Sequence, residues 1–289
     1  MFRRIKNRDK RTDSILMAHL QKPSVPEIPI DHDLTVKLGN AQHQGKRDYQ
    51  EDSFGFSDTD DEFVMQKGML AVLADGMGGL SNGKAVSGRV VSDMLEWFNQ
   101  RSEECRDGND IKDRVLIINK NICSIFCDDG TVKSGSTIVT AFIKHRKLHW
   151  LCIGDSRIYL KRGGRIYQIN EDHDFLNQLL GEAIRDGESV ASAFEDPQKD
   201  RLVSCIGKSD LNCFDYSKKG FSIQANDKIM LCSDGVYNAL TAEELNVLLE
   251  SEPMRAAENI KNEVVGKSFP GQDNLTVIVI AIDDKGEEQ

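Results

Sequence analysis

One short stretch, Met69 to Gly79, constrains the fold of this chain more than any other. Its apolar run ends abruptly at an acid, Asp75, and glycines follow at positions 76, 78 and 79. A run this short and apolar, closed by glycines, predicts a buried strand that leads into a tight turn. Because a buried carboxylate without a partner is costly, Asp75 needs hydrogen bonds or a cation. Taken alone, the stretch is equally consistent with an ordinary strand end and a simple Asp turn.

The same succession of an apolar run and an acid recurs along the chain. Acids stand at or beside strand-like runs at Asp155, Asp234, Asp273 and the pair Glu51–Asp52. Most of them adjoin glycine or serine, and glycine lets the backbone come close to whatever binds there. Carboxylates at the ends of several different strands are what a shared, oxygen-rich metal site requires.

The charge and hydropathy of the chain exclude several classes of protein. Its 37 basic and 47 acidic residues give a net charge of −10, which argues against a general nucleic-acid binder. No run approaches the roughly 18 apolar residues of a membrane span, and no signal-peptide pattern follows the basic start. The seven cysteines include no Cys-x-x-Cys pair, which disfavours a disulfide framework or a zinc site. These features predict a soluble, cytoplasmic protein.

Hydrophobic periodicity predicts strands that come in groups and helices that come in pairs. Strands are expected over residues 34–44 (an edge strand, from its partial alternation), 52–57, 68–74, 136–143, 148–153, 157–161, 165–169, 228–232 and 275–282. Helices are expected over residues 85–98, 111–126, 175–185, 189–194, 242–250 and 253–265. This segregation favours an α+β domain with sheets packed on each other and helix pairs outside, over a doubly wound parallel sheet.

The two ends of the chain are expected to lie outside this domain. Residues 1–33 combine a basic start with three prolines, and a flexible tail is the first interpretation. A weak attachment to an anionic surface or an acidic partner is the second. The folded domain is predicted over residues 34–283, and residues 284–289 form a charged C-terminal tail.

Six polar motifs follow one another along the chain, most of them beside strand-like runs. They are Gly45–Asp52, Asp75–Gly79, Ser134–Thr137, Gly154–Arg157, Cys232–Gly235 and Gly271–Thr276. No single motif is specific, but all six in this order form a highly specific pattern. From about Leu34 to Ile282 the chain resembles the metal-dependent serine/threonine protein phosphatases, the type 2C (PP2C) or PPM family, and the Met of Asp-Gly-Met-Gly-Gly resembles its bacterial branch.

The resemblance implies both a fold and a metal site. The fold would be a central antiparallel β-sandwich flanked by helix pairs, in four layers α-β-β-α, with the metal site at one end. Asp75 would bridge two divalent ions, Mn²⁺ or Mg²⁺, and Gly76 would bind one of them through its carbonyl. Asp234 and Asp273 would complete the protein ligands. Asp155 matches a position that, in some relatives, joins the equivalent of Asp234 around a third, weaker ion.

The resemblance also implies the residues that act on substrate. Glu51 and Asp52 match an acidic pair that holds the ions largely through waters, and Arg47 matches an arginine that binds the substrate phosphate. Two ions about 3.5–4 Å apart can share a water and make it a hydroxide near neutral pH. Oxygen ligands suit Mn²⁺ or Mg²⁺, and a guanidinium offers a planar two-point grip on phosphate.

The function predicted in this way is direct hydrolysis of phosphoserine and phosphothreonine in proteins by a metal-bridging hydroxide. The expected partners are phosphorylated protein substrates and a cognate serine/threonine kinase that the enzyme opposes, and a monomer is expected. The alternative is a catalytically weak relative that binds phosphoproteins or acts as a scaffold. Its expected signature is loss of metal carboxylates, whereas Asp75, Asp234 and Asp273 are all present.

Several residues depart from the family pattern or have a structural interpretation. Met77 stands where animal relatives carry a histidine proposed as general acid, so another donor, bound water or His43, is required, although a lone histidine is more often structural. Lys133 stands where several bacterial relatives have an aspartate for the third ion, which argues against a third site of that type. His173, Ser156 and Arg157 are interpreted as structural. Residues 177–200 match the family's variable flap, where substrate preference is expected.

Overall fold

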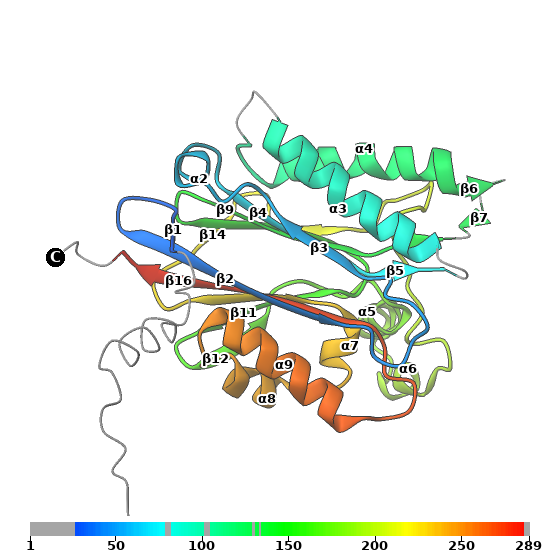
Figure 1. The fold of residues 1–289 in the computed structure, drawn as a ribbon. Coiled ribbons are helices and arrows are strands. Elements are labelled where there is room, and N and C mark those ends of the chain that lie inside the picture. Colours follow the sequence, from blue (N-terminus) through cyan, green and yellow to red (C-terminus); the bar gives the residue numbers. More distant parts are fainter. Residues whose placement is uncertain (1–26, 79–81, 101–104, 129–130, 133, 286–289) are drawn as a thin grey trace, which may run out of the picture.

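The computed structural model describes residues 27–78, 82–100, 105–128, 131–132 and 134–285. Two six-stranded antiparallel sheets pack face to face, and helices cover both outer faces (Figure 1). The chain therefore has the α+β sandwich, in layers α-β-β-α, that the sequence predicted.

The first sheet has the strand order β1-β2-β16-β15-β11-β12, with antiparallel neighbours throughout. Its strands are β1 (Ile28–Pro29), β2 (Leu34–His43), β16 (Leu275–Asp284), β15 (Lys228–Cys232), β11 (Arg157–Arg162) and β12 (Arg165–Gln168). The long β16 pairs with β2 along its whole length, so the last strand of the fold lies beside one of the first.

The second sheet has the order β13-β10-β9-β4-β3, and β14 also pairs with β10. Its strands are β3 (Ser53–Phe56), β4 (Met69–Ala74), β9 (Ile138–Lys144), β10 (Lys147–Ile153), β13 (Asp215–Tyr216) and β14 (Phe221–Ser222). Two short ladders join β5 (Gly76–Met77) to β8 (Gly135–Ser136) and β6 (Cys127–Asp128) to β7 (Thr131–Val132).

Each outer face of the sandwich carries a helix pair (Figure 1). The helices α3 (Asn82–Gln100) and α4 (Gly108–Phe126) cover the second sheet, and α8 (Ala242–Leu248) and α9 (Pro253–Lys267) cover the first. The short helix α7 (Asp234–Tyr237) follows β15 directly, and α2 (Asp61–Lys67) precedes β4. The pair α5 (Phe175–Asp186) and α6 (Ala191–Glu195) lies at one end of the sandwich, near β5 and α7 (Figure 1).

The strand sequences explain the layers, because the central strands are apolar on both faces. Along β16, Ile278, Ile280 and Ile282 point into the core between the sheets. The alternate residues Val277 and Val279 point into the core under α8 and α9. Since successive side chains of a strand face opposite ways, a strand buried on both faces reads as a continuous apolar run.

The structure corrects two predictions about the start of the domain. The strand over residues 34–44 is not an edge strand, because β2 lies between β1 and β16. The domain also begins before Leu34, because Ile28 and Pro29 pair with Val36 and Thr35. Pro29 is compatible with that position since an edge strand leaves one row of backbone groups unpaired. Residues 1–26, the rest of the predicted tail, and residues 286–289 lie outside the described residues.

The other predicted strands and helices are present, with shifts of one to a few residues at their ends. Helices α2 and α7 and the short strands β5, β8, β13 and β14 were not predicted, because elements this short carry no periodic signal. In the described part of the chain, no helix has the length and apolar character that crossing a membrane requires.

Candidate metal centre

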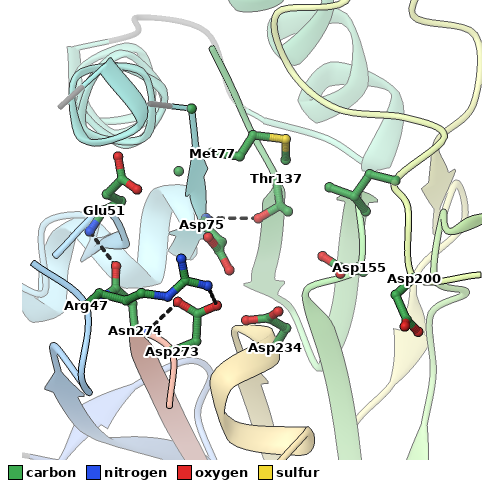
Figure 2. Close-up of a pocket in the computed structure, with 13 residues that line it drawn as sticks. Arg47, Glu51, Asp75, Met77, Thr137, Asp155, Asp200, Asp234, Asp273 and Asn274 are labelled. Atoms are coloured by element: carbon green, nitrogen blue, oxygen red, sulfur yellow. Dashed lines mark hydrogen bonds and ion pairs between the residues drawn. The ribbon is translucent and has the colours of Figure 1, made fainter. Parts of the chain in front are cut away.

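A pocket of about 550 Å³ opens at the end of the sandwich where β5, α7 and α5 meet. Figure 2 shows that carboxylates from several separate elements face into it. Its lining residues are Arg47, Glu51, Asp75, Gly76, Met77, Gly78, Thr137, Asp155, Asp200, Leu202, Asp234, Asp273 and Asn274.

The fold brings these acids together because each one stands at the same end of a strand. Asp75 lies between β4 and β5, and Asp155 lies in the turn between β10 and β11. Asp234 is the first residue of α7, directly after β15, and Asp273 stands two residues before β16. Glu51 stands two residues before β3. Strands of both sheets thus contribute a carboxylate to one pocket.

Two glycines permit the close backbone approaches that the pocket needs. A Cβ atom on Gly76 would overlap the carbonyl of Gly83 in α3, and one on Gly235 would overlap the carbonyl of Asn274. A residue with a side chain at either position would therefore separate the strand ends that carry Asp75, Asp234 and Asp273. This leaves the peptide next to Asp75 at the pocket wall, where Gly76 is a lining residue.

Asp52 lies behind the pocket wall and is completely buried. Its Oδ2 atom accepts hydrogen bonds from Ser233 Oγ at 2.9 Å and Thr276 Oγ1 at 2.7 Å. Its Oδ1 atom is also buried, and among the described residues it has no hydrogen-bond partner. A buried carboxylate oxygen without a donor is costly, so this atom requires a cation or an ordered water.

The acids of the pocket repel one another. Burial raises the pKa of Asp75 well above its usual range, and the carboxylates of Asp52, Asp234, Asp155 and Asp273 raise it further. Burial, with help from neighbouring acids, raises the pKa of Asp234 to about 7 and the pKa values of Asp52 and Asp155 to about 6. These shifts mean that the ionised cluster is unstable until positive charge is added.

Arg47 is the one basic residue that lines the described pocket. Its guanidinium forms an ion pair with Asp273, and its side chain is 56% exposed at the pocket mouth (Figure 2). One monovalent cation on one acid leaves Asp75, Asp155 and Asp234 without a balancing charge. The exposed position leaves the guanidinium accessible to an anionic ligand.

The donor set fits divalent ions that prefer oxygen. Carboxylates and a backbone carbonyl suit Mn²⁺ and Mg²⁺, and the unpartnered Asp52 oxygen and the mutual repulsion of the acids supply the need for positive charge. In the described residues, no three His, Cys or acidic side chains surround a single point as an all-protein cage would. Mg²⁺ usually keeps several waters and binds through one or two carboxylates, so the open arrangement agrees with such ions.

Asn274 fixes the loop that carries Arg47, and the sequence did not single it out. Its side chain is 5% exposed, and its Nδ2 atom donates to the carbonyls of Gln44 at 2.8 Å and Tyr49 at 2.9 Å. Its Oδ1 atom accepts from the Glu51 backbone N–H at 2.7 Å. One amide therefore holds both ends of the segment between Gln44 and Glu51 beside Asp273. Its place in the last polar motif was the available signal.

The structure separates the remaining predicted residues into two groups. Met77 lines the pocket and His43 does not; the Nδ1 atom of His43 accepts from the Gly45 backbone N–H at 2.9 Å. His173 and Ser156 are buried away from the lining and hydrogen-bond to Gly154 and Thr137 respectively. Lys133 and Gly79 lie outside the described residues.

Three lining residues had no assigned role: Thr137, Asp200 and Leu202. The hydroxyl of Thr137 accepts from the Asp75 backbone N–H at 2.9 Å, which holds the strand end that carries Asp75. Asp200 and Leu202 lie where the chain leaves the predicted flap. An exposed acid in a charged loop gives no sequence signal for a pocket position, which explains why Asp200 was missed.

A family model described as protein phosphatase 2C matches residues 40–262. The chain belongs to the protein phosphatase 2C family. Among its PP2C relatives, protein phosphatase PhpP of Streptococcus pneumoniae is 27% identical over 222 residues, which cover 76% of this chain and 88% of that protein. Serine/threonine phosphatase stp of Listeria innocua is 26% identical over 244 residues, which cover 81% of this chain and 90% of that protein.

Solved structures of PP2C proteins share the fold. The serine/threonine phosphatase of S. agalactiae superposes with a TM-score of 0.71 at 22% identity, covering 85% of this chain and 99% of that one. The catalytic domain of the phosphatase PstP, solved with two manganese ions, superposes with a TM-score of 0.67 at 23% identity, covering 87% of this chain and all of that one. The antiparallel sandwich with helices on both faces is thus the PP2C fold.

Proposed function

We propose that this PP2C protein hydrolyses phosphoserine and phosphothreonine in proteins and requires Mn²⁺ or Mg²⁺. The observation that carries the proposal is the convergence of Asp75, Asp155, Asp234 and Asp273 on one pocket that also holds Arg47. The relatives named as serine/threonine phosphatases support the same substrate class. A cognate kinase, a monomeric state and a cytoplasmic location stay predictions from the sequence.

The metal-binding roles follow from where the oxygen atoms lie. Asp75, Asp234, Asp273 and the Gly76 carbonyl would hold two ions, and Asp155 with Asp234 would hold a weaker third. Glu51 at the rim and Asp52 behind the wall would orient the waters of those ions. When bound, the ions activate a water as the nucleophile and neutralise charge that develops on the phosphoryl group.

Arg47 would orient the substrate. A phosphate dianion at the pocket mouth offers the guanidinium two oxygens, a stronger geometry than its contact with one Asp273 carboxylate oxygen. Because the Arg47 side chain is exposed, the exchange of partners requires no rearrangement of the core.

The proton for the serine or threonine leaving group has to come from water or a carboxylic acid. Among the described residues that line the pocket none is a histidine, and Met77 carries no titratable proton. His43 is engaged with the Gly45 backbone outside the lining, which removes it as the immediate donor.

The test is hydrolysis of a phosphothreonine peptide with Mn²⁺, with Mg²⁺ and with EDTA. Activity should need the metal and fall at least a hundredfold in Asp234→Asn, the typical scale for removing an electrostatic contact to the reacting group. Asp113→Asn is the matched control, because Asp113 is exposed on α4 and its variant should keep wild-type activity. A folded, metal-loaded protein that binds the peptide without hydrolysing it would support the scaffold alternative instead.

A further inference from the structure

Tyr237 lies behind the wall of the metal centre and contacts one of its acids. It is the last residue of α7, the four-residue helix that begins with Asp234. Its hydroxyl hydrogen-bonds to the Asp155 carboxylate. Burial and the carboxylates of Asp155 and Asp234 raise the pKa of the phenol, so the hydroxyl is the donor. Tyr237 itself does not line the pocket.

The ring of Tyr237 is held in place from its other side by Arg157. The guanidinium carbon of Arg157 lies 3.5 Å from the ring centroid, within cation–π distance. Arg157 donates to Asp172 Oδ2 from Nε at 2.9 Å and from Nη2 at 2.6 Å, and Nη1 donates to the Tyr159 hydroxyl at 3.2 Å. A guanidinium with three such bonds has little freedom, so the ring it covers is fixed as well.

Asp172 is itself anchored, which completes a chain of contacts from the flap to the pocket. Its side chain is 6% exposed and also accepts from Gln168 Nε2 at 2.8 Å. The Asp172 carbonyl accepts from Asn177 Nδ2 of α5 at 2.8 Å. The sequence identified Arg157 as structural, but it did not show that Arg157 acts on Tyr237.

Asp155 needs such support because its neighbours repel it. It follows Gly154, which has φ +102° in the turn between β10 and β11, and its carboxylate faces the acids of Asp75 and Asp234. With those charges in front of it, a donor behind it is required to keep the carboxylate directed at the pocket.

We propose that Tyr237 is a positioning residue that holds the Asp155 carboxylate where it can share a divalent ion with Asp234. This inference rests on the proposed function for the identity of the ions, but not on catalysis. Asp234 and the Tyr237 hydroxyl belong to the same short helix, so α7 fixes one ligand directly and the other through the phenol. The competing explanation is that Tyr237 only packs against the apolar cluster under α7.

The variant Tyr237→Phe separates the two explanations, because it keeps the ring, its packing and its stack on Arg157 and removes only the hydroxyl. Mn²⁺ binding to the full chain is measured by electron paramagnetic resonance of free Mn²⁺ and by calorimetry. Tyr237→Phe should weaken the lowest-affinity site by roughly tenfold, the lower end of the range for lost support of a metal ligand. Asp155→Asn should remove the same site.

The double variant Asp155→Asn/Tyr237→Phe is the decisive comparison, because it should bind Mn²⁺ as Asp155→Asn does. Tyr167→Phe is the matched control, since Tyr167 is 48% exposed on β12 and its variant should bind as wild type. Metal-free unfolding in urea checks that Tyr237→Phe is folded. If it is not, Asp172→Asn, which loosens Arg157, should weaken the same site.

Three results would overturn the proposal. They are an unchanged Mn²⁺ isotherm in folded Tyr237→Phe, an equal loss with and without Asp155, and a wild-type isotherm that Asp155→Asn leaves unchanged. Failure of the proposed function would appear differently, as normal Mn²⁺ binding without hydrolysis of the phosphothreonine peptide.

Discussion

Replacing Asn274 by alanine tests whether one amide organises the substrate side of the metal centre. The change removes three hydrogen bonds that join this amide to the backbone of Gln44, Tyr49 and Glu51. The backbone N–H of Asn274, which donates to Asp273 Oδ1 at 2.8 Å, stays in place. The variant therefore releases the Arg47 loop while it leaves this support of the proposed metal ligand intact.

The size of the effect follows from the three lost bonds. Each contributes about 0.5–1.5 kcal/mol net, and a buried donor left unpaired costs about 1–3 kcal/mol. The carbonyls of Gln44 and Tyr49 belong to exposed residues and regain water, whereas the Glu51 N–H is partly buried. We expect the free energy of unfolding to fall by about 2–3 kcal/mol, mostly through Glu51.

The assay is urea unfolding of the metal-free protein, followed by circular dichroism, together with kinetics on a phosphothreonine peptide. Because the loop carries Arg47, KM should rise about tenfold while the Mn²⁺ concentration for half-maximal activity stays within about twofold, the tenfold step corresponding to about 1.4 kcal/mol of binding. Asn262→Ala on α9 is the control, since Asn262 is exposed and alanine is a good helix former. A loss below about 0.5 kcal/mol in Asn274→Ala, the usual range for surface substitutions, would refute this account of the loop.

Three further predictions concern charge. In the metal-free protein, the pKa values of about 6 for Asp52 and Asp155 and about 7 for Asp234 lie above the unfolded value of 3.8. The native state thus binds more protons, and the free energy of unfolding should fall as pH rises from about 4 to about 7; a flat or rising curve in urea titrations would contradict this. Mn²⁺ at a hundred times its Kd should add about 2.7 kcal/mol of stability at neutral pH, and thermal unfolding should show that Asp234→Asn loses most of that gain. Asp227, 1% exposed and paired with the Arg162 guanidinium at 2.5 Å, should cost about 3 kcal/mol in Asp227→Ala, measured by chemical unfolding against Asp113→Asn as control; a loss no larger than the control's would show that Arg162 finds water instead.

Much of the site was predictable from local sequence. An apolar run that ends in an acid and glycine needs no partner to be recognised, and this identified Asp75, Asp155 and Asp234. The alternation of faces in a strand and the spacing of a helix are likewise local, so most of the strands and helices were predicted with small errors at their ends. The order of the six motifs carried the resemblance to the PP2C family.

The partners of those residues were decided by the tertiary structure. Arg47 pairs with Asp273, and Asp52 accepts from Thr276, across more than two hundred residues of sequence in each case. The acidic pair Glu51–Asp52 reads as one unit in the sequence, but a strand directs successive side chains to opposite sides. Glu51 therefore lines the pocket, whereas Asp52 is buried behind it.

The sequence by itself determined which residue types stand at the strand ends, because turns and strands are encoded by near neighbours. Only the packed sandwich decided that β2 is covered by β1, that Asn274 holds the Arg47 loop, and that Tyr237 contacts Asp155. These contacts depend on how two sheets and α7 meet at one end of the molecule. No local pattern records that meeting, because the free energy that produces it comes from burying both sheets in a shared core.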